Sequence, residues 1–259
     1  MAVHKTDLSE FNDVYEALLE ATTAFTTFTN SRDHVPVADF IDDHEIRLWR
    51  YPIQFSVDGA FTVTVTIPAS SIEALDCDVD ILRDLAFFET SDRETSSGNV
   101  QLHLPLLLIK KRAGLANEQA SVATRNKRAR VATTNEQRIA TASAAWFLAH
   151  LGIKDFPIFS LVTCGEKGYL SQAWFSTRDE CCYVADCNIR RNPFDLGAGD
   201  LRYKAFLSKL KDHAKELESR FEGAREQLLV RAMGDGGSTL RWSARAQLAE
   251  YEEAGWAIE

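Results

Sequence analysis

The chain has 259 residues, of which 45% are hydrophobic, so it can bury one sizeable core. Its formal net charge of -9 argues against a surface that is basic throughout, and so against a whole-surface platform for nucleic acid or membranes. No apolar run approaches the roughly 20 residues of a membrane-spanning helix, and five cysteines without a signal-peptide-like start favour an intracellular protein, cytoplasmic or nuclear.

Two elements are predicted in the first part of the chain. Apolar residues recur at helical spacing over about 7–28, which predicts a first helix. Two segments with alternating apolar and polar residues, 45–57 and 60–67, flank Asp58-Gly59, a dipeptide typical of tight hairpin turns. We therefore expect an N-terminal β-hairpin after the helix.

The stretch 104–112, LPLLLIKKR, is the most informative part of the chain. Its short apolar run predicts a strand that is covered on both faces and that pairs antiparallel with a strand at 82–89. The run leads directly into Lys110 and Lys111, and a cation at the end of a central strand can neutralise charge on a phosphate. Because successive side chains of a strand point to opposite faces, only one lysine faces a site at this edge. We favour Lys110, on the face of Leu108.

Basic residues gather between positions 110 and 130, where there are seven of them and a single acid, Glu118. Residues 112–134 hold few large apolar side chains, which predicts a loop or the solvated start of a helix. An ordinary solvated surface would explain this basic island, and so would a contact surface for phosphates, which needs local positive potential. Five of its residues are the candidate nucleic-acid contacts: Arg112, Arg125, Lys127, Arg128 and Arg130.

The second half of the chain predicts a helix, several strands and a longer helix. Residues 135–151 have a helical pattern that ends at Gly152, and 200–233 have a long one that ends at the sequence GDGG. Between the two helices, three runs bounded by turns predict strands: 156–164, 168–176 and 181–187. We expect an α/β protein with a central mixed β-sheet flanked by helices, one domain at 1–233 and an appended helix or tail at 234–259.

This order of elements, with an apolar strand that ends in lysine and a helix with an early glutamine, resembles the restriction-endonuclease-like PD-(D/E)XK superfamily. More closely, the stretch QRIATASAAWFLAHLGIKDFPIFSLVTCGEKGYLSQAWFS resembles a group of uncharacterised fungal proteins. The resemblance covers about residues 80–220 and implies a restriction-endonuclease-like core. In that superfamily, carboxylates at one edge of the sheet hold Mg²⁺, which activates water and stabilises the phosphate, while a lysine neutralises charge.

The resemblance implies matches for a first acid, a lysine, a helical glutamine and a first-helix acid: Asp84, Lys110 or Lys111, Gln137, and Glu16 or Glu20, in that order. The second metal-binding acid is missing, because Leu108 stands two residues before Lys110. Aliphatic carbons cannot hold a hard cation, so no metal is expected at this site. In an alternative, Glu136 from the helix is a migrated acid that binds Mg²⁺ together with Asp84.

Three hypotheses for function follow. The leading one is a pseudoenzyme, a catalytically degenerate nuclease-like protein that binds nucleic acid or a protein partner. The first alternative is an active Mg²⁺-dependent nuclease that uses Glu136. The second is a protein-interaction platform that uses the helix at 200–233 and the tail after it.

Overall fold

The structure is a computed structural model of the chain. It describes residues 8–26, 35–36, 57–77, 81–82, 85, 99–112, 123–187, 193–196, 200–234 and 240. The described helices are α1 (Leu8–Thr26), α3 (Ala69–Ala74), α5 (Ala123–His150) and α6 (Leu201–Met233). The described strands are β1 (Val35–Pro36), β2 (Gly59–Ile67), β3 (Val100–Arg112), β4 (Ile158–Cys164), β5 (Lys167–Ser176), β6 (Cys181–Asp186) and β7 (Phe194–Asp195).

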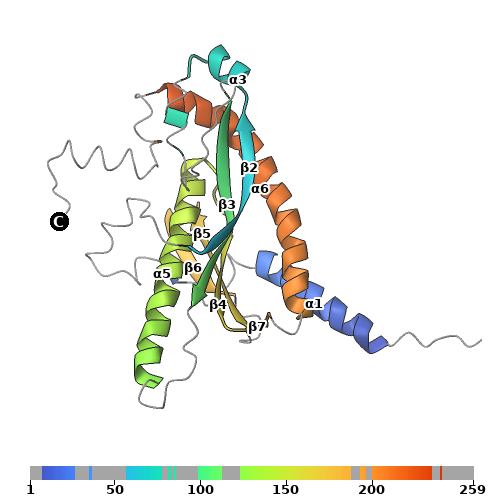
Figure 1. Cartoon of the computed structure of the whole chain (residues 1–259). Helices are drawn as coiled ribbons and strands as arrows, with labels where there is room; N and C mark the ends of the chain where they lie inside the picture. Colours follow the sequence, from blue (N-terminus) through green and yellow to red (C-terminus); the bar gives the residue numbers. More distant parts are fainter. Residues whose placement is uncertain are drawn as a thin grey trace, which may run out of the picture.

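These strands form one mixed sheet in the order β1-β6-β5-β4-β3-β2, with β7 beside β5 (Figure 1). Strands β3 and β4 run parallel, and the other described pairs are antiparallel. Parallel neighbours need a crossover connection, and α5 supplies it between β3 and β4. The predicted α/β class, with a mixed sheet, flanking helices and a long C-terminal helix, is confirmed.

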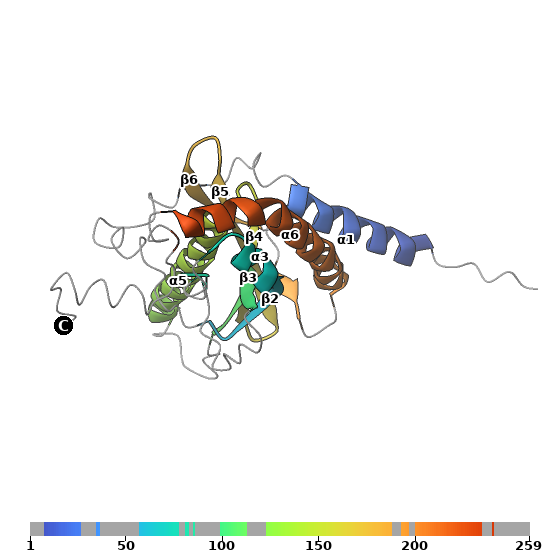
Figure 2. The same ribbon diagram turned by 90° about the horizontal axis from the view of Figure 1, so that it is seen from above.

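Helix α5 lies on one face of the sheet and the first part of α6 lies on the other (Figures 1 and 2). The two helices meet where α5 ends, because the Arg231 side chain of α6 donates to the carbonyl of His150. On the first face, the ring centroids of Trp146 in α5 and Phe175 in β5 are 4.8 Å apart. On the opposite face, the ring centroids of Phe206 in α6 and Phe159 in β4 are 5.3 Å apart. Helix α1 packs along α6 and extends that second layer.

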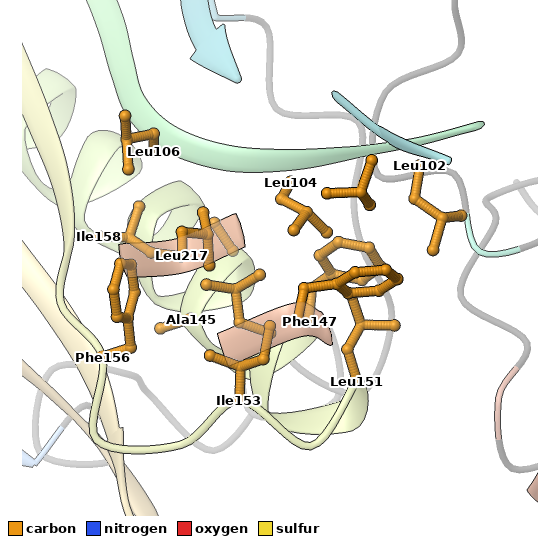
Figure 3. Close-up of a cluster of buried hydrophobic side chains, with 14 of the residues drawn as sticks. Leu102, Leu104, Leu106, Ala145, Phe147, Leu151, Ile153, Phe156, Ile158 and Leu217 are labelled. Carbon is orange, nitrogen blue, oxygen red and sulfur yellow. The ribbon is translucent and has the colours of Figure 1, made fainter. Parts of the chain in front are cut away.

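Strand β3 lies at the centre of the core. Its residues Leu102, Leu104 and Leu106 are each at most 4% exposed. Figure 3 shows these three side chains pointing into a cluster that includes Phe147 of α5 and Leu217 of α6. The interior strand predicted from its apolar run is therefore present.

Helix α5 begins at Ala123, well before its predicted start, so part of the basic island is helical. Its end agrees with the sequence. The N–H of Ile153 donates to the carbonyl of Leu148 at 2.8 Å, and the N–H of Gly152 donates to that of Ala149 at 3.0 Å. Gly152 has a φ of 93°, which completes a Schellman motif and favours glycine at this position.

Helix α6 matches the predicted long helix. Asp200 caps its start, and the Asp200 carboxylate accepts a hydrogen bond from the N–H of Arg202 at 2.9 Å. A stripe of α6 residues at helical spacing is buried: Ala205, Phe206, Leu210, His213, Leu217, Phe221, Ala224, Leu228, Leu229 and Ala232. The stripe packs against the sheet and α1, so the apolar face of α6 is used within this fold.

The predicted antiparallel pairing of β3 with a strand at 82–89 is wrong. Ile81 and Leu82 are helical and Leu85 lies in a turn. Strand β3 instead pairs antiparallel with β2 along one edge and parallel with β4 along the other. The short run LRDLAFFE is compatible with a buried helical turn as well as with a strand, and periodicity alone does not separate the two.

Other predictions meet the structure only in part. Of the predicted hairpin, the second strand is β2, whereas residues 45–56 lie outside the described residues. Of the predicted tail helix, only Leu240 is described, and it is buried. The two-residue strands β1 and β7 were not predicted. No helix in the described part of the chain is long and apolar enough to cross a membrane.

Candidate functional site

The carboxyl ends of the parallel strands β3 and β4 lie side by side. In register, Leu108 pairs with Ser160 and Lys110 pairs with Val162. Ligands of α/β sheets commonly bind outside the carboxyl ends of neighbouring parallel strands. We call the five residues that meet at this end of β3 the lysine edge: Asp58, Leu108, Lys110, Lys111 and Gln137.

Strand pairing decides which lysine faces α5. Phe159 of β4 faces α6, so its neighbour Ser160 faces α5, because side chains alternate along a strand. Leu108 and Lys110 of β3 lie beside Ser160 and Val162 and share their face. Lys110 is therefore on the α5 side and half-buried, whereas Lys111 is on the opposite side and exposed.

Gln137 connects α5 to β3 just before the lysines. Its side chain is 2% exposed, and its Nε2 donates to the carbonyl of Leu108 at 3.2 Å. The hydroxyl of Thr141 donates to the carbonyl of Gln137 at 2.7 Å. A buried carbonyl is satisfied in this way, so Gln137 has a structural role at the place where the resemblance implies a glutamine.

Asp58 is a site residue that the sequence did not reveal. Its N–H donates to the carbonyl of Ile109 at 2.9 Å, and its Oδ2 accepts from the backbone N–H of Lys111 at 2.5 Å. The signal was present in the dipeptide Asp58-Gly59, which we attributed to a hairpin turn. Gly59 is the first residue of β2 and pairs with Ile109, which brings the acid to the end of β3.

Leu108 occupies the position where the resemblance expects a metal-binding acid. It is 0% exposed and belongs to the hydrophobic core. The structure thus brings together Lys110, Leu108 and Gln137, with Asp58 beside them. The aliphatic side chain leaves no oxygen ligand at that position.

The remaining candidate residues are elsewhere or outside the described part. Asp84 lies outside the described residues, as do the side chains of Glu136, Arg112, Arg125, Lys127, Arg128 and Arg130. Glu16 and Glu20 are on α1, which packs on α6, on the sheet face opposite α5. The pKa of Arg202 in α6 is raised first by Asp200 and also by the charge of Glu20, which places Glu20 near α6.

A row of neighbouring residues on four strands fixes α5 through one backbone carbonyl and one carboxylate. The successive neighbours in this row are Leu108, Ser160, Ser171 and Asp186. The hydroxyls of Ser160 and Ser171 are 2.6 Å apart and buried. Arg138, next to Gln137 in α5, donates from Nη2 to both carboxylate oxygens of Asp186 at 2.7 and 2.6 Å. Gln137 and Arg138 therefore bind the two ends of one row.

From this contact α5 continues toward its N-terminus past the end of β3 (Figure 1). The 14 residues 123–136 precede Gln137, which corresponds to about 21 Å of helix at 1.5 Å per residue. Four basic residues lie on this segment of the helix, Arg125, Lys127, Arg128 and Arg130, with Glu136 as its one acid. The backbone of this segment continues directly from Gln137, a residue of the lysine edge.

Within the described residues, no group of three or more His, Cys, Asp or Glu side chains is arranged to hold a metal ion. Comparisons of the chain with protein-family models, with curated proteins and with solved structures find no match. The functional assignment therefore depends on the chemistry of the lysine edge.

Proposed function

We propose that this chain is a nuclease-like α/β protein without catalysis, and that it binds nucleic acid through the lysine edge and the basic segment of α5. The observation that carries the proposal is the pair Leu108 and Lys110. The position for a second metal ligand holds a buried aliphatic side chain, while the adjoining lysine is kept. A site that retains its cation but has leucine in place of the second acid is suited to hold phosphate rather than to cleave it.

The distribution of charge supports nucleic acid over a protein partner. The chain is acidic overall at -9, yet residues 110–130 hold seven basic residues and a single acid. This segment runs from the end of β3 into the part of α5 that extends past the sheet. Local positive potential of this kind attracts a phosphate backbone even on a protein with net negative charge.

The structure gives less support to an interaction platform built on α6. Ten residues of the apolar stripe of α6 are buried against the sheet and α1. Such a helix has already used the face that a partner helix would need. Binding of a protein partner therefore becomes an outcome of the test below rather than the leading function.

A second function, Mg²⁺-dependent cleavage, is favoured by Asp58. Its carboxylate lies beside the backbone of Lys111, so one acid and two lysines meet at the lysine edge. In that alternative, Asp58 and the migrated acid Glu136 would supply oxygen ligands. Cleavage of an oligonucleotide that requires Mg²⁺ and is lost in Asp58→Asn and Lys110→Gln would establish it in place of the proposal.

The deciding experiment is binding of labelled DNA and RNA oligonucleotides to the full chain between about 50 and 200 mM salt. Affinity should fall steeply with salt, and Lys110→Gln/Lys111→Gln should weaken binding and lower the slope by about two. A matched control is Lys215→Gln on α6, where the side chain is 78% exposed and pairs with Asp212 of the same helix. Absence of salt-dependent binding to every oligonucleotide would overturn the proposal and favour a protein partner.

A further inference from the structure

Tyr169 lies in one row with Lys110 across three strands. Lys110 of β3 pairs with Val162 of β4, and Val162 pairs with Tyr169 of β5. Neighbouring strands are about 4.8 Å apart, so the Cα atoms of Lys110 and Tyr169 are about 10 Å apart. Val162 is 7% exposed and forms the floor between them. We call these three residues the lysine–tyrosine row.

The row lies on the α5 side of the sheet. It is next to the contacts that Gln137 and Arg138 of α5 make with the strands, which we call the clamp. Tyr169, Ser171 and Phe175 are an even number of positions apart along β5, and so their side chains point to the same face of the sheet. The Phe175 ring contacts Trp146 of α5. Tyr169 therefore shares the face of α5. The row formed by Leu108, Ser160, Ser171 and Asp186 is adjacent. The lysine–tyrosine row is the next row toward the carboxyl ends of β3 and β4.

The exposure of Tyr169 differs from that of the aromatic residues near the end of β5. Its side chain is 41% exposed, whereas Trp174 and Phe175 of the same strand are at most 8% exposed. The row thus presents a ring and a cation on the face of the sheet where α5 lies. A duplex backbone requires only cations, but unpaired bases also require a flat ring on which to stack.

We propose that the lysine–tyrosine row binds single-stranded nucleic acid, with the Tyr169 ring stacked on a base and Lys110 on the phosphate backbone. The basic segment of α5 adds attraction along the strand without reading its sequence. This inference rests on the proposed function and adds to it the class of nucleic acid. It predicts that single strands are bound more tightly than duplexes of the same length and sequence.

The test compares full-length variants by fluorescence anisotropy with matched single-stranded and duplex oligonucleotides. Tyr169→Ala and Tyr169→Leu remove the ring, and Leu keeps an apolar side chain on the strand. Each should weaken single-strand binding by about 5-fold to 150-fold, the equivalent of one stacked base. Duplex binding should change little, and Tyr169→Phe, which retains the ring, should bind as the wild type does.

A matched control is Phe61→Ala. Phe61 is 50% exposed on β2 but pairs with Leu107, which lies beside Phe159 and so on the α6 side of the sheet. Its removal should leave single-strand binding unchanged. Equal binding of single strands and duplexes, unaffected by Tyr169→Ala and Tyr169→Leu, would overturn this inference. The proposed function would still hold in that case if Lys110→Gln/Lys111→Gln weakened both. No binding of either oligonucleotide would overturn both.

Discussion

The two ends of the layer formed by β3 and α5 differ in their side chains, which are buried and apolar at one end and charged at the other. Where β3 begins and α5 finishes, Leu102, Leu104 and Phe147 are at most 1% exposed and lie in one cluster (Figure 3). Where β3 finishes, Lys110 is half-buried, Lys111 is exposed, and α5 runs on into a segment with four basic residues. One strand and one helix therefore each have a structural part and a charged part. A substitution should alter stability in the first and binding in the second.

The largest effect is expected at the structural end. Phe147→Ala removes a fully buried ring and should lower the free energy of unfolding by about 3 to 5 kcal/mol. Lys111→Ala, at the charged end, should lower it by no more than about 0.5 kcal/mol. Urea unfolding of both variants measures the difference, and similar losses would show that the two ends are not distinct in this sense.

Leu108 lies at the boundary between the two ends. The variant Leu108→Glu tests whether this position can hold a metal ligand. A carboxylate at this buried position should cost about 3 kcal/mol in the absence of a metal. If Asp58 can share an ion with the new carboxylate, Mg²⁺ should recover much of the loss. The measurement is the melting temperature with Mg²⁺ and with a chelator.

Leu108→Gln is the control for that experiment, since the glutamine has a similar shape and no charge. Its melting temperature should not respond to Mg²⁺. If Leu108→Glu responds no more than Leu108→Gln, the lysine edge is not the remnant of a metal site, although it could still bind phosphate.

His213, a buried residue of α6, provides a test by pH within the core. It stacks on Phe156 with ring centroids 4.0 Å apart, and its Nε2 lies 2.7 Å from the carbonyl oxygen of Pro157. Burial lowers the pKa of His213 to about 4, from 6.5. The unfolded chain then binds a proton more readily than the folded one, so stability is complete above about pH 6.5 and decreases as the pH falls toward 4.

The loss should reach up to about 3 kcal/mol at the acid end of that window. His213→Phe should flatten this part of the dependence of stability on pH. Burial also lowers the pKa of His150, so a smaller decline in the same direction should remain in the variant. An unchanged slope between pH 6.5 and 4 would contradict the assignment to His213.

The smallest effect concerns the clamp between α5 and the sheet. Gln137→Leu removes the Nε2 donor to the buried carbonyl of Leu108 and should cost about 1 to 2 kcal/mol. Arg138→Leu breaks an ion pair in which the Asp186 side chain is 43% exposed, and should cost at most about 1 kcal/mol. Both values come from chemical denaturation, and a reversed order would show that the Asp186 contact is the stronger end of the clamp.

Local patterns in the sequence predicted much of the fold. Helices α1 and α6, strands β4, β5 and β6, and the glycine terminus of α5 at Gly152 have strong periodicity or clear end signals. The start of α5 was missed because residues 123–134 contain few large apolar side chains, and such a sequence has no apolar periodicity to detect.

The site was predicted less completely than the fold. The sequence indicated Lys110 and Gln137, because a lysine after an apolar strand and an early helical glutamine are local features. Asp58 is 53 positions from Lys111, and its place beside β3 depends on the pairing of β2 with β3. Such a pairing has no counterpart within a single segment, so it could not be read from residue spacing.

The partners of the first elements of the chain have a consequence for folding during synthesis. Helix α1 packs on α6, and Val35 of β1 pairs with Val184 of β6. Both partners are translated long after α1 itself. At about 5 to 20 residues per second, α1 waits on the order of 10 to 40 seconds for α6 to emerge. During that interval the apolar side chains of α1 have no docking surface, and a chaperone that shields Leu18 and Leu19, at 38% and 49% exposed even in the folded chain, would protect nascent chains from aggregation.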